Sequence, residues 1–534
     1  MRKAVLGAAL GLVFVAVSAN AQISIDQMAP ASAYDAGVLQ AGDGGLDSAL
    51  WQGVSAARAT SLIKNIDTSA DGYARSLIKS ALLSGGVPPQ AADNSEREAY
   101  IVARLSAVLA LGELDGFDKL ASQSGINPAK PVFTKIFVER ALLGGDTKTA
   151  CASTDTVTTG RKSPYWAKMR AFCHIVRGEM PAAELTSDLL SRSGHEDAGF
   201  FSLLGALTTP TKTNFAPDLI KTPLDTALAR LLLDKKQIDY KILPPVLLKE
   251  IALDIGAAPK TRLWALQRSA DIVTPSQFST ILSSLADAPL TDPKNLKAKV
   301  WDATTWGGAY LSLKNSTDMN LSTELAGALL AQADKAGTLL GVAKALETET
   351  GFISAEFQAK HNAKTFTRLA VLRRDMGTLR GLFGALDTDN PLRARIALAS
   401  DALGNGFMLG ELGVDIETRL HVESKDKDAA KIKSRAVRDS FIAVAMGAQL
   451  SETAEDVLRT EKLKGRSLNP TDLLALQAAA RRGSKAEIAL RAADMVDGKT
   501  LRADALAAML TTLSSAGMTD QAGQLAALDI LDVK

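Results

Sequence analysis

Two serine–lysine pairs have the spacing that some nucleophilic enzymes use. Ser61 precedes Lys64, and Ser76 precedes Lys79, by three positions each. In penicillin-binding enzymes this spacing sets a lysine beside a serine nucleophile. Those enzymes also need Ser-Asp-Asn and Lys-Thr-Gly elements, and the sequence contains neither. Two copies of the pair, close together in the chain, instead indicate two amphipathic helices of similar pattern.

Phosphate-loop and metal-binding motifs are incomplete in this sequence. A lysine and a threonine follow Gly498, but Ala493 stands where a phosphate loop has its first glycine. The histidines are few and far apart, at His174, His195, His361 and His421. We therefore expect no catalytic site of these kinds, no metal site and no cofactor. A carboxylate pair acting on cell-wall or polysaccharide substrates stays open, because the chain has 59 acidic residues.

The chain has two cysteines, Cys151 and Cys173, and each falls in a predicted short helix. These helices cover residues 146–156 and 164–176. A disulfide would join neighbouring antiparallel helices, and closing a loop of about 23 residues would stabilise the chain by roughly 3 kcal/mol. The alternative is a pair of buried free thiols, since cysteine is among the most buried residue types. We favour the disulfide.

The densest aromatic cluster contains Trp301, Trp306 and Tyr310. Aromatic side chains often dominate the binding energy of protein interfaces. We therefore select these three residues as the best candidates for a partner-binding surface. The alternative is that they pack in the core, which is the commoner place for large aromatic side chains.

Short amphipathic helices must carry these residues. Apolar residues recur at steps of three and four from Leu50 to Ile66, as an amphipathic helix requires. Further helices are predicted over residues 73–83, 96–111 and 114–121. Strand signals are scarce, because alanine and leucine dominate over alternating valine, isoleucine and threonine. We predict an all-α fold of about twenty or more short helices.

Proline marks where many of these helices begin. Proline is tolerated in the first turn of a helix and disrupts a helix interior. The prolines that we expect at helix starts are Pro131, Pro164, Pro181, Pro244, Pro259, Pro275, Pro391 and Pro470.

Several segments share the order apolar helix, glycine turn, second helix with small residues. One such segment has its turn at Gly178, and another has its turn at Gly517. This order is the helix–turn–helix unit of an α-solenoid. The chain resembles the periplasmic tetratricopeptide-like solenoid proteins of Gram-negative, especially alphaproteobacterial, cells. No segment carries the full 34-residue consensus, so the repeats are degenerate and the resemblance implies architecture only. An irregular, non-repeating helical domain is the alternative.

The N-terminus has the three parts of a secretory signal peptide. Arg2 and Lys3 are positive, an apolar stretch runs over residues 4–17, and Ala19 and Ala21 frame a cleavage site. We expect cleavage after Ala21 and a periplasmic protein. The apolar stretch is too short for the alternative, a membrane anchor. No later stretch is apolar enough to span a membrane, so we expect no integral membrane segment.

Beyond the signal peptide of residues 1–21, we divide the chain into four parts. Residues 22–45 read as a flexible leader, and residues 46–420 as the helical-repeat array. Residues 421–438 form a charged connector of mixed sign, interpreted as a solvated helix face or linker. Residues 439–534 form a C-terminal helical module.

The charge balance disfavours a nucleic-acid partner. The chain has 61 basic and 59 acidic residues, and loss of Arg2 and Lys3 with the signal makes these numbers equal. We therefore expect no strongly basic field. The function that we expect is that of a non-enzymatic periplasmic scaffold or adaptor. It would bind protein partners of an envelope-spanning machine, with flagellar motility or surface-organelle assembly as the first choice. The alternative is the cell-wall or polysaccharide enzyme with an unrecognised carboxylate pair.

Overall fold

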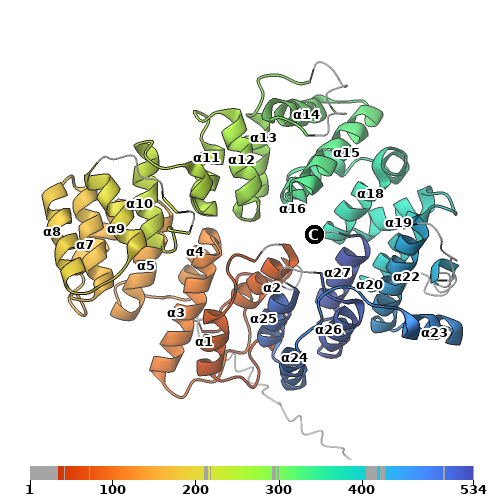
Figure 1. Cartoon of the computed structure of the whole chain (residues 1–534), viewed down its shortest axis with the longest axis horizontal. Coiled ribbons are helices and arrows are strands. Elements are labelled where there is room, and N and C mark those ends of the chain that lie inside the picture. Colours follow the sequence, from red (N-terminus) through yellow and green to blue (C-terminus); the bar gives the residue numbers. More distant parts are fainter. Residues whose placement is uncertain are drawn as a thin grey trace, which may run out of the picture.

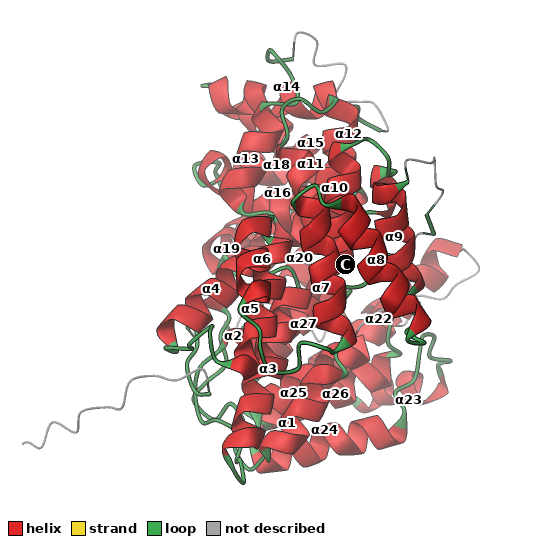
Figure 2. Ribbon diagram, turned by 90° about the vertical axis from the view of Figure 1, so that its left-hand side faces the viewer, coloured by secondary structure: helices red, strands yellow, loops and turns green. Residues whose placement is uncertain are grey.

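The computed structural model shows helices that follow one another around a closed ring (Figure 1). The structure describes residues 34–532 except 41–42, 71, 210–214, 217, 291–295, 297–299, 405–415, 417, 421–426 and 497–499. Within these residues, β-structure is limited to three isolated bridges, and the side view is helical throughout (Figure 2). The all-α prediction is confirmed. The predicted signal peptide, residues 1–21, lies outside the described residues.

The first part of the ring runs from the N-terminal helices through α8 to α10. Its helices are α1 (Ala56–Lys64), α2 (Gly72–Leu83), α3 (Asn94–Ala110), α4 (Leu114–Gln123), α5 (Pro131–Leu143), α6 (Thr147–Asp155), α7 (Pro164–Val176), α8 (Met180–Arg192), α9 (Ala198–Thr208) and α10 (Pro223–Asp234).

The second part crosses the far side of the ring. Its helices are η2 (Tyr240–Ile242), α11 (Pro245–Leu253), α12 (Pro259–Ser269), η3 (Ala270–Ile272), α13 (Pro275–Ser283), α14 (Ala303–Asn315), α15 (Met319–Lys335), α16 (Leu339–Ala345), α17 (Glu347–Thr350), α18 (Ala355–Arg373), α19 (Met376–Ala385) and α20 (Pro391–Ala402).

The third part returns to the N-terminal helices. Its helices are α22 (Lys427–Ala445), α23 (Glu452–Thr460), α24 (Pro470–Arg482), α25 (Lys485–Val496), α26 (Ala503–Ser515) and α27 (Thr519–Ile530).

Proline starts helices as the sequence predicts. Pro164 is the first residue of α7 and Pro391 is the first residue of α20. Pro181 is the second residue of α8. Pro244 stands one position early, as the residue that precedes the first turn of α11. At these positions proline gives up no intrahelical hydrogen bond, because the first amides of a helix have no partner within it.

Consecutive helices form hairpins of the kind expected of an α-solenoid. α7 turns at Gly178 and packs along α8, and α26 turns at Gly517 and packs along α27. Both glycines have positive φ angles, of 79° and 72°, which a residue with a Cβ adopts at a cost. The tetratricopeptide-like type of the repeat stays a prediction.

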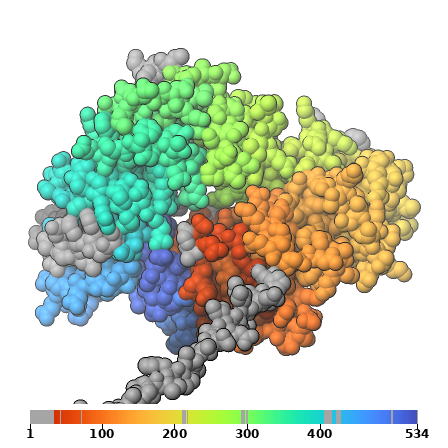
Figure 3. Space-filling model, turned by 180° about the vertical axis from the view of Figure 1, so that it is seen from behind, coloured from red at the N-terminus to blue at the C-terminus, as the bar shows by residue number. Residues whose placement is uncertain are grey.

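The ring closes where the N-terminal helices meet the C-terminal ones. α2 packs along α25, and the space-filling view places the red N-terminal residues beside the blue C-terminal residues (Figure 3). The backbone amide of Ala486 donates to the carbonyl of Leu50 at 2.8 Å. The Tyr73 hydroxyl donates to the carbonyl of Gln521 at 2.5 Å. The N-terminal and C-terminal helices therefore pack directly against each other and close the ring.

The division near residue 438 does not appear as a connector. Residues 427–438 form the first part of α22, which continues across the predicted boundary to Ala445 and packs against α26. α20, from the predicted array, packs against α27, from the predicted module. Residues 421–426 lie outside the described part of the chain. Residues 427–438 are helical and expose Lys431 and Ser434, so of the two interpretations the solvated helix face fits this part of the stretch and the linker does not.

Part of the predicted flexible leader packs on the N-terminal helices. The backbone amides of Val38 and Leu39 donate to the carbonyl of Leu83 at 2.7 and 3.1 Å. Arg104 is fully buried, and its guanidinium donates to the carbonyl of Ala36 at 2.8 Å. The Tyr34 ring is buried as well. The expectation of a flexible leader is therefore wrong for the described residues from 34 to 45.

The first predicted helix begins later than its apolar pattern indicates. Trp51 and Val54 are buried, but they lie in turns before α1. Gly53 has a φ of +67°, which interrupts helical geometry. The Ser55 side chain then accepts a hydrogen bond from the Arg58 amide and starts the helix at Ala56. Over the part of the chain that the structure describes, no helix is long and apolar enough to cross a membrane.

Candidate functional site

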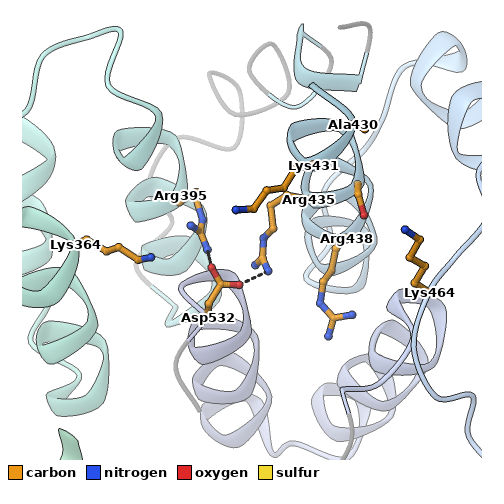
Figure 4. Close-up of a pocket in the computed structure, with 9 residues that line it drawn as sticks. Lys364, Arg395, Ala430, Lys431, Arg435, Arg438, Lys464 and Asp532 are labelled. Atoms are coloured by element: carbon orange, nitrogen blue, oxygen red, sulfur yellow. Dashed lines mark hydrogen bonds and ion pairs between the residues drawn. The ribbon is translucent and has the colours of Figure 1, made fainter. Parts of the chain in front are cut away.

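A cavity of about 620 Å³ lies where the end of α27 meets α18, α20 and α22. Its charged lining is almost entirely basic. Asp532, which follows α27, is the one acidic residue among those that line it. The six cationic side chains are Lys364 from α18, Arg395 from α20, Lys431, Arg435 and Arg438 from α22, and Lys464 from the segment after α23 (Figure 4).

α22 supplies half of these cations because of their spacing. Lys431, Arg435 and Arg438 follow one another at steps of four and three residues, and such residues lie on one face of a helix. The acidic residue Asp439, one position further, points elsewhere and is fully buried. A stretch of mixed charge in the sequence thus presents a basic face toward the cavity and places Asp439 in the interior.

Two arginines hold the carboxylate at the base of the cavity. Arg395 lies 2.9 Å from Oδ2 of Asp532, and Arg435 lies 2.8 Å from Oδ1 (Figure 4). Burial raises the pKa of Asp532, but the charges of Arg435 and Arg395 outweigh burial and hold the pKa below its ordinary value. Asp532 is therefore an ionised carboxylate at neutral pH.

The arginines themselves are fixed by further contacts. Arg438 pairs with both carboxylate oxygens of Asp529, at 2.6 and 2.5 Å. Arg435 also contacts Asp439 at 2.9 Å. The bidentate pair of Arg438 with Asp529, and the hydrogen bonds of Arg435 to the Asp532 side chain and the Asp529 carbonyl, join α22 to the end of α27. The arginine part of the cavity is a rigid frame whose charge is largely neutralised.

The three lysines differ from the arginines. Lys364, Lys431 and Lys464 are exposed, and among the residues that the structure describes they form no salt bridge or hydrogen bond, although the charge of Lys364 contributes to lowering the pKa of Asp532. In Figure 4, Lys364 and Lys431 extend toward each other from opposite sides of Asp532, and Lys464 lies on the other side of α22. The cavity therefore carries a net positive charge that comes from these ammonium groups.

This arrangement is suited to holding an anion. Hydrolytic or acid–base chemistry needs a nucleophile next to a base, or two carboxyl groups with different proton affinities. The cavity lining offers one carboxylate, Asp532, which two arginines already hold, and one hydroxyl, that of Ser434. Neither is paired with a base. Within the described residues, no group of three histidine, cysteine or acidic side chains can hold a metal ion.

Cys151 and Cys173 form a disulfide, as predicted. The Cα atoms lie 5.5 Å apart, and the bond joins α6 to α7. Both residues are buried, at 4% and 1% exposure. The alternative of two free thiols is wrong. The disulfide lies far along the ring from the cavity (Figure 1), so its role is to clip a helix pair.

The aromatic cluster is part of the core, and this corrects the expectation of an exposed partner-binding surface. Trp301, Trp306 and Tyr310 are 5%, 3% and 0% exposed. The two tryptophan rings meet edge to face at 6.0 Å, and the hydroxyls of Tyr310 and Ser279 share a hydrogen bond of 2.5 Å. Trp306 and Tyr310 lie on α14, which packs against α13 and α15, and Trp301 precedes this helix. Core packing was the open alternative.

Sequence reasoning missed the cavity residues. Lys431, Arg435 and Arg438 stood in the charged stretch, where a helical projection would have shown a basic face. Lys364, Arg395 and Lys464 are isolated in the sequence and gave no signal. The expectation of no strongly basic field holds for the whole chain and fails for this cavity. A comparison with protein-family models, with curated proteins and with solved structures finds no match to this chain.

Proposed function

We propose that this protein is a non-enzymatic scaffold or adaptor of the bacterial periplasm. It holds protein partners of an envelope-spanning machine and anchors the assembly through a negatively charged group bound in the cavity. Flagellar motility and surface-organelle assembly are the settings that we expect first. The cavity carries this proposal: six cationic side chains and one carboxylate line it, and a concave surface of one charge sign concentrates and holds the opposite charge.

The protonation state of the cavity's carboxylate supports ligand binding rather than catalysis. The lowered pKa of Asp532 makes this carboxylate a weak base. The alternative, an enzyme acting on polysaccharides, needs two carboxyl groups about 5–9 Å apart across the substrate. The cavity supplies one such group.

The disulfide and the closed ring support the rest of the proposal. A disulfide such as Cys151–Cys173 persists in an oxidising compartment, which agrees with export to the periplasm. The ring joins its two ends through α2 and α25. A closed array keeps its outer helix faces in fixed positions, as a scaffold for several partners requires.

Site-specific photocrosslinking in the native bacterium tests the proposal. A photoreactive amino acid replaces Ser434, an exposed residue of the cavity lining, or Ser122, an exposed control residue on α4. We expect a discrete protein partner to be captured from position 434 and not from position 122. This capture must disappear in the triple variant K364E/K431E/K464E.

A matched variant controls for net charge. Lys119, Lys148 and Lys235 are exposed and lie outside the cavity, so K119E/K148E/K235E changes the net charge equally. Capture that survives the cavity variant, or that both triple variants abolish, rules out the cavity as the anchoring site. A deletion strain with normal motility, surface attachment and envelope integrity contradicts the scaffold role.

A further inference from the structure

We infer that the cavity binds a diphosphate group, either as a free anion or as the headgroup of a lipid. The inference rests on the proposed anchoring role of the cavity and names the chemistry of the group that it holds. The charge of the cavity and the type of donor that stays available favour this ligand.

The unpaired charge in the cavity sets the valence of the ligand. Asp532 is shared by Arg395 and Arg435, Asp439 is shared by Arg435 and Arg419, and Asp529 pairs with Arg438, so three carboxylates offset three of these four arginine charges. The three lysines remain outside these pairs. A phosphate monoester carries about −1.5 to −2 at neutral pH, which leaves part of this charge uncompensated. A diphosphate carries about three charges by the same chemistry, and it matches three ammonium groups.

The donors that stay available favour phosphate over carboxylate. A guanidinium fork recognises planar carboxylates by two parallel hydrogen bonds. Here Arg438 uses its fork on Asp529, and Arg435 donates to the Asp532 side chain and to the backbone carbonyl of Asp529. Lysine ammonium groups are point charges with three donors each, and they bind tetrahedral phosphate oxygens from any side. Carboxylates and phosphates both lose the bidentate contact that free arginines would give them, and the freely rotating lysine donors suit the tetrahedral oxygens of phosphate.

The placement of the lysines favours a compact anion over an extended one. Lys364 comes from α18, Lys431 from α22, and Lys464 from the segment after α23, so the charges come from three segments instead of following one helix. Lys364 and Lys431 face each other beside Asp532, and Lys464 lies on the far side of α22 (Figure 4). A volume of about 620 Å³ is typical of small-ligand sites. The ion pairs below the lysines are already formed, so few groups must be ordered on binding.

Titration calorimetry on the exported protein tests the inference with inorganic pyrophosphate, orthophosphate and citrate. Citrate is a control of similar charge with carboxylates in place of phosphates. We expect pyrophosphate to bind at least about tenfold more tightly than either control, because each charge-assisted contact is worth this factor or more. The variant K431A should weaken pyrophosphate binding about tenfold.

A lysine triple variant and its control separate the site from general charge. K364A/K431A/K464A should abolish measurable binding, and K119A/K148A/K235A should leave it unchanged. Circular dichroism confirms that both variants fold, since all six lysines are exposed. Equal affinity for citrate and pyrophosphate, or pyrophosphate binding that survives the cavity variant, overturns the inference.

Vesicles distinguish the two sources of the diphosphate. Phosphatidylcholine vesicles that contain a polyprenyl diphosphate are compared with vesicles that contain the polyprenyl monophosphate. Lysine-dependent sedimentation with the diphosphate vesicles alone identifies a lipid headgroup. Binding of free pyrophosphate without sedimentation identifies a soluble ligand, and both results support the site. If pyrophosphate fails to bind while crosslinking from position 434 still depends on the lysines, this inference fails and the proposed function stands.

Discussion

Arg58 of α1 donates a hydrogen bond of 2.6 Å to the carboxylate of Glu487 in α25, although the two residues are 429 positions apart in the sequence. The Glu487 side chain is fully buried. Two further arginines, Arg482 and Arg491, contact the same carboxylate at 2.7 and 3.0 Å. This cluster lies at the junction of the N-terminal and C-terminal helices and holds the ring closed.

Replacement of Glu487 by glutamine should destabilise the protein. The glutamine keeps the shape of the side chain but leaves three arginines without their counter-charge. Because Arg58 is 47% exposed, we expect a loss of about 2 kcal/mol, below the roughly 3–5 kcal/mol of a fully buried pair. Urea unfolding measures this difference. The control Glu324→Gln, at an exposed position, should change the free energy of unfolding by less than about 0.5 kcal/mol.

The contribution of Glu487 should depend on pH. Burial raises its pKa, but hydrogen bonds from Arg58, Arg482 and Arg491 outweigh burial and place the pKa below that of an ordinary glutamate. Because the pKa of Glu487 is lower in the folded state, its contribution to stability is fully present above the pKa of the unfolded state, about 4.3. This stability is lost as the pH falls from there through the folded pKa. The difference between the wild type and Glu487→Gln should therefore be constant near neutral pH and shrink below about pH 4. If this difference in the free energy of unfolding grows as the pH falls, Glu487 is not the ionised centre of the arginine cluster.

The disulfide should stabilise the α6–α7 pair. Cys151 and Cys173 are 22 positions apart, and closing such a loop is worth about 3 kcal/mol in the chain-entropy model. Addition of a reductant should lower the midpoint of denaturant unfolding of the wild type. The variant Cys151→Ala/Cys173→Ala should show the lower midpoint at once and should not respond to the reductant.

Replacement of Trp306 by alanine should lower the free energy of unfolding. This side chain is 3% exposed and packs on Trp301, so Trp306→Ala should cost about 3–5 kcal/mol through lost packing and a residual cavity. Phe352 is 54% exposed, and Phe352→Ala should cost less than about 0.5 kcal/mol. Normal stability of Trp306→Ala together with loss of the crosslinked partner would restore the aromatic cluster as a binding surface.

Local rules predicted the helices because each rule involves few neighbouring residues. Proline at Pro164 and Pro391, and glycine at Gly178 and Gly517, determine where helices start and turn. Ring closure was not predictable in this way. It depends on the pairing of Arg58 with Glu487 and of Leu50 with Ala486, and neither pair is marked by a local pattern.

The cavity could not be predicted because net charge sums over the whole chain. Lys364, Arg395 and Lys464 come from three separate segments, and only the curvature of the ring brings them to α22. The mixed charges of residues 421–438 alone indicate a solvated helix face or linker. The helix instead buries Asp439 and turns Lys431 toward the cavity, a sorting that depends on which face α26 covers.

Replacement of Asp532 by asparagine should strengthen binding of pyrophosphate, although it weakens the attachment of α27. The change removes the one negative charge of the lining and releases Arg395 and Arg435, which both lie within 3 Å of this carboxylate. We expect pyrophosphate affinity to rise about tenfold, as the loss of a nearby like charge and the gain of free guanidinium donors predict.

The free energy of unfolding should fall by about 1–3 kcal/mol, because two arginines lose their partner. Asp520 of α27 pairs with Arg374 and is 66% exposed, so Asp520→Asn should leave pyrophosphate affinity unchanged. Calorimetry at a temperature where both variants stay folded compares them, and unchanged or weaker binding by Asp532→Asn would place the ligand away from the arginine frame.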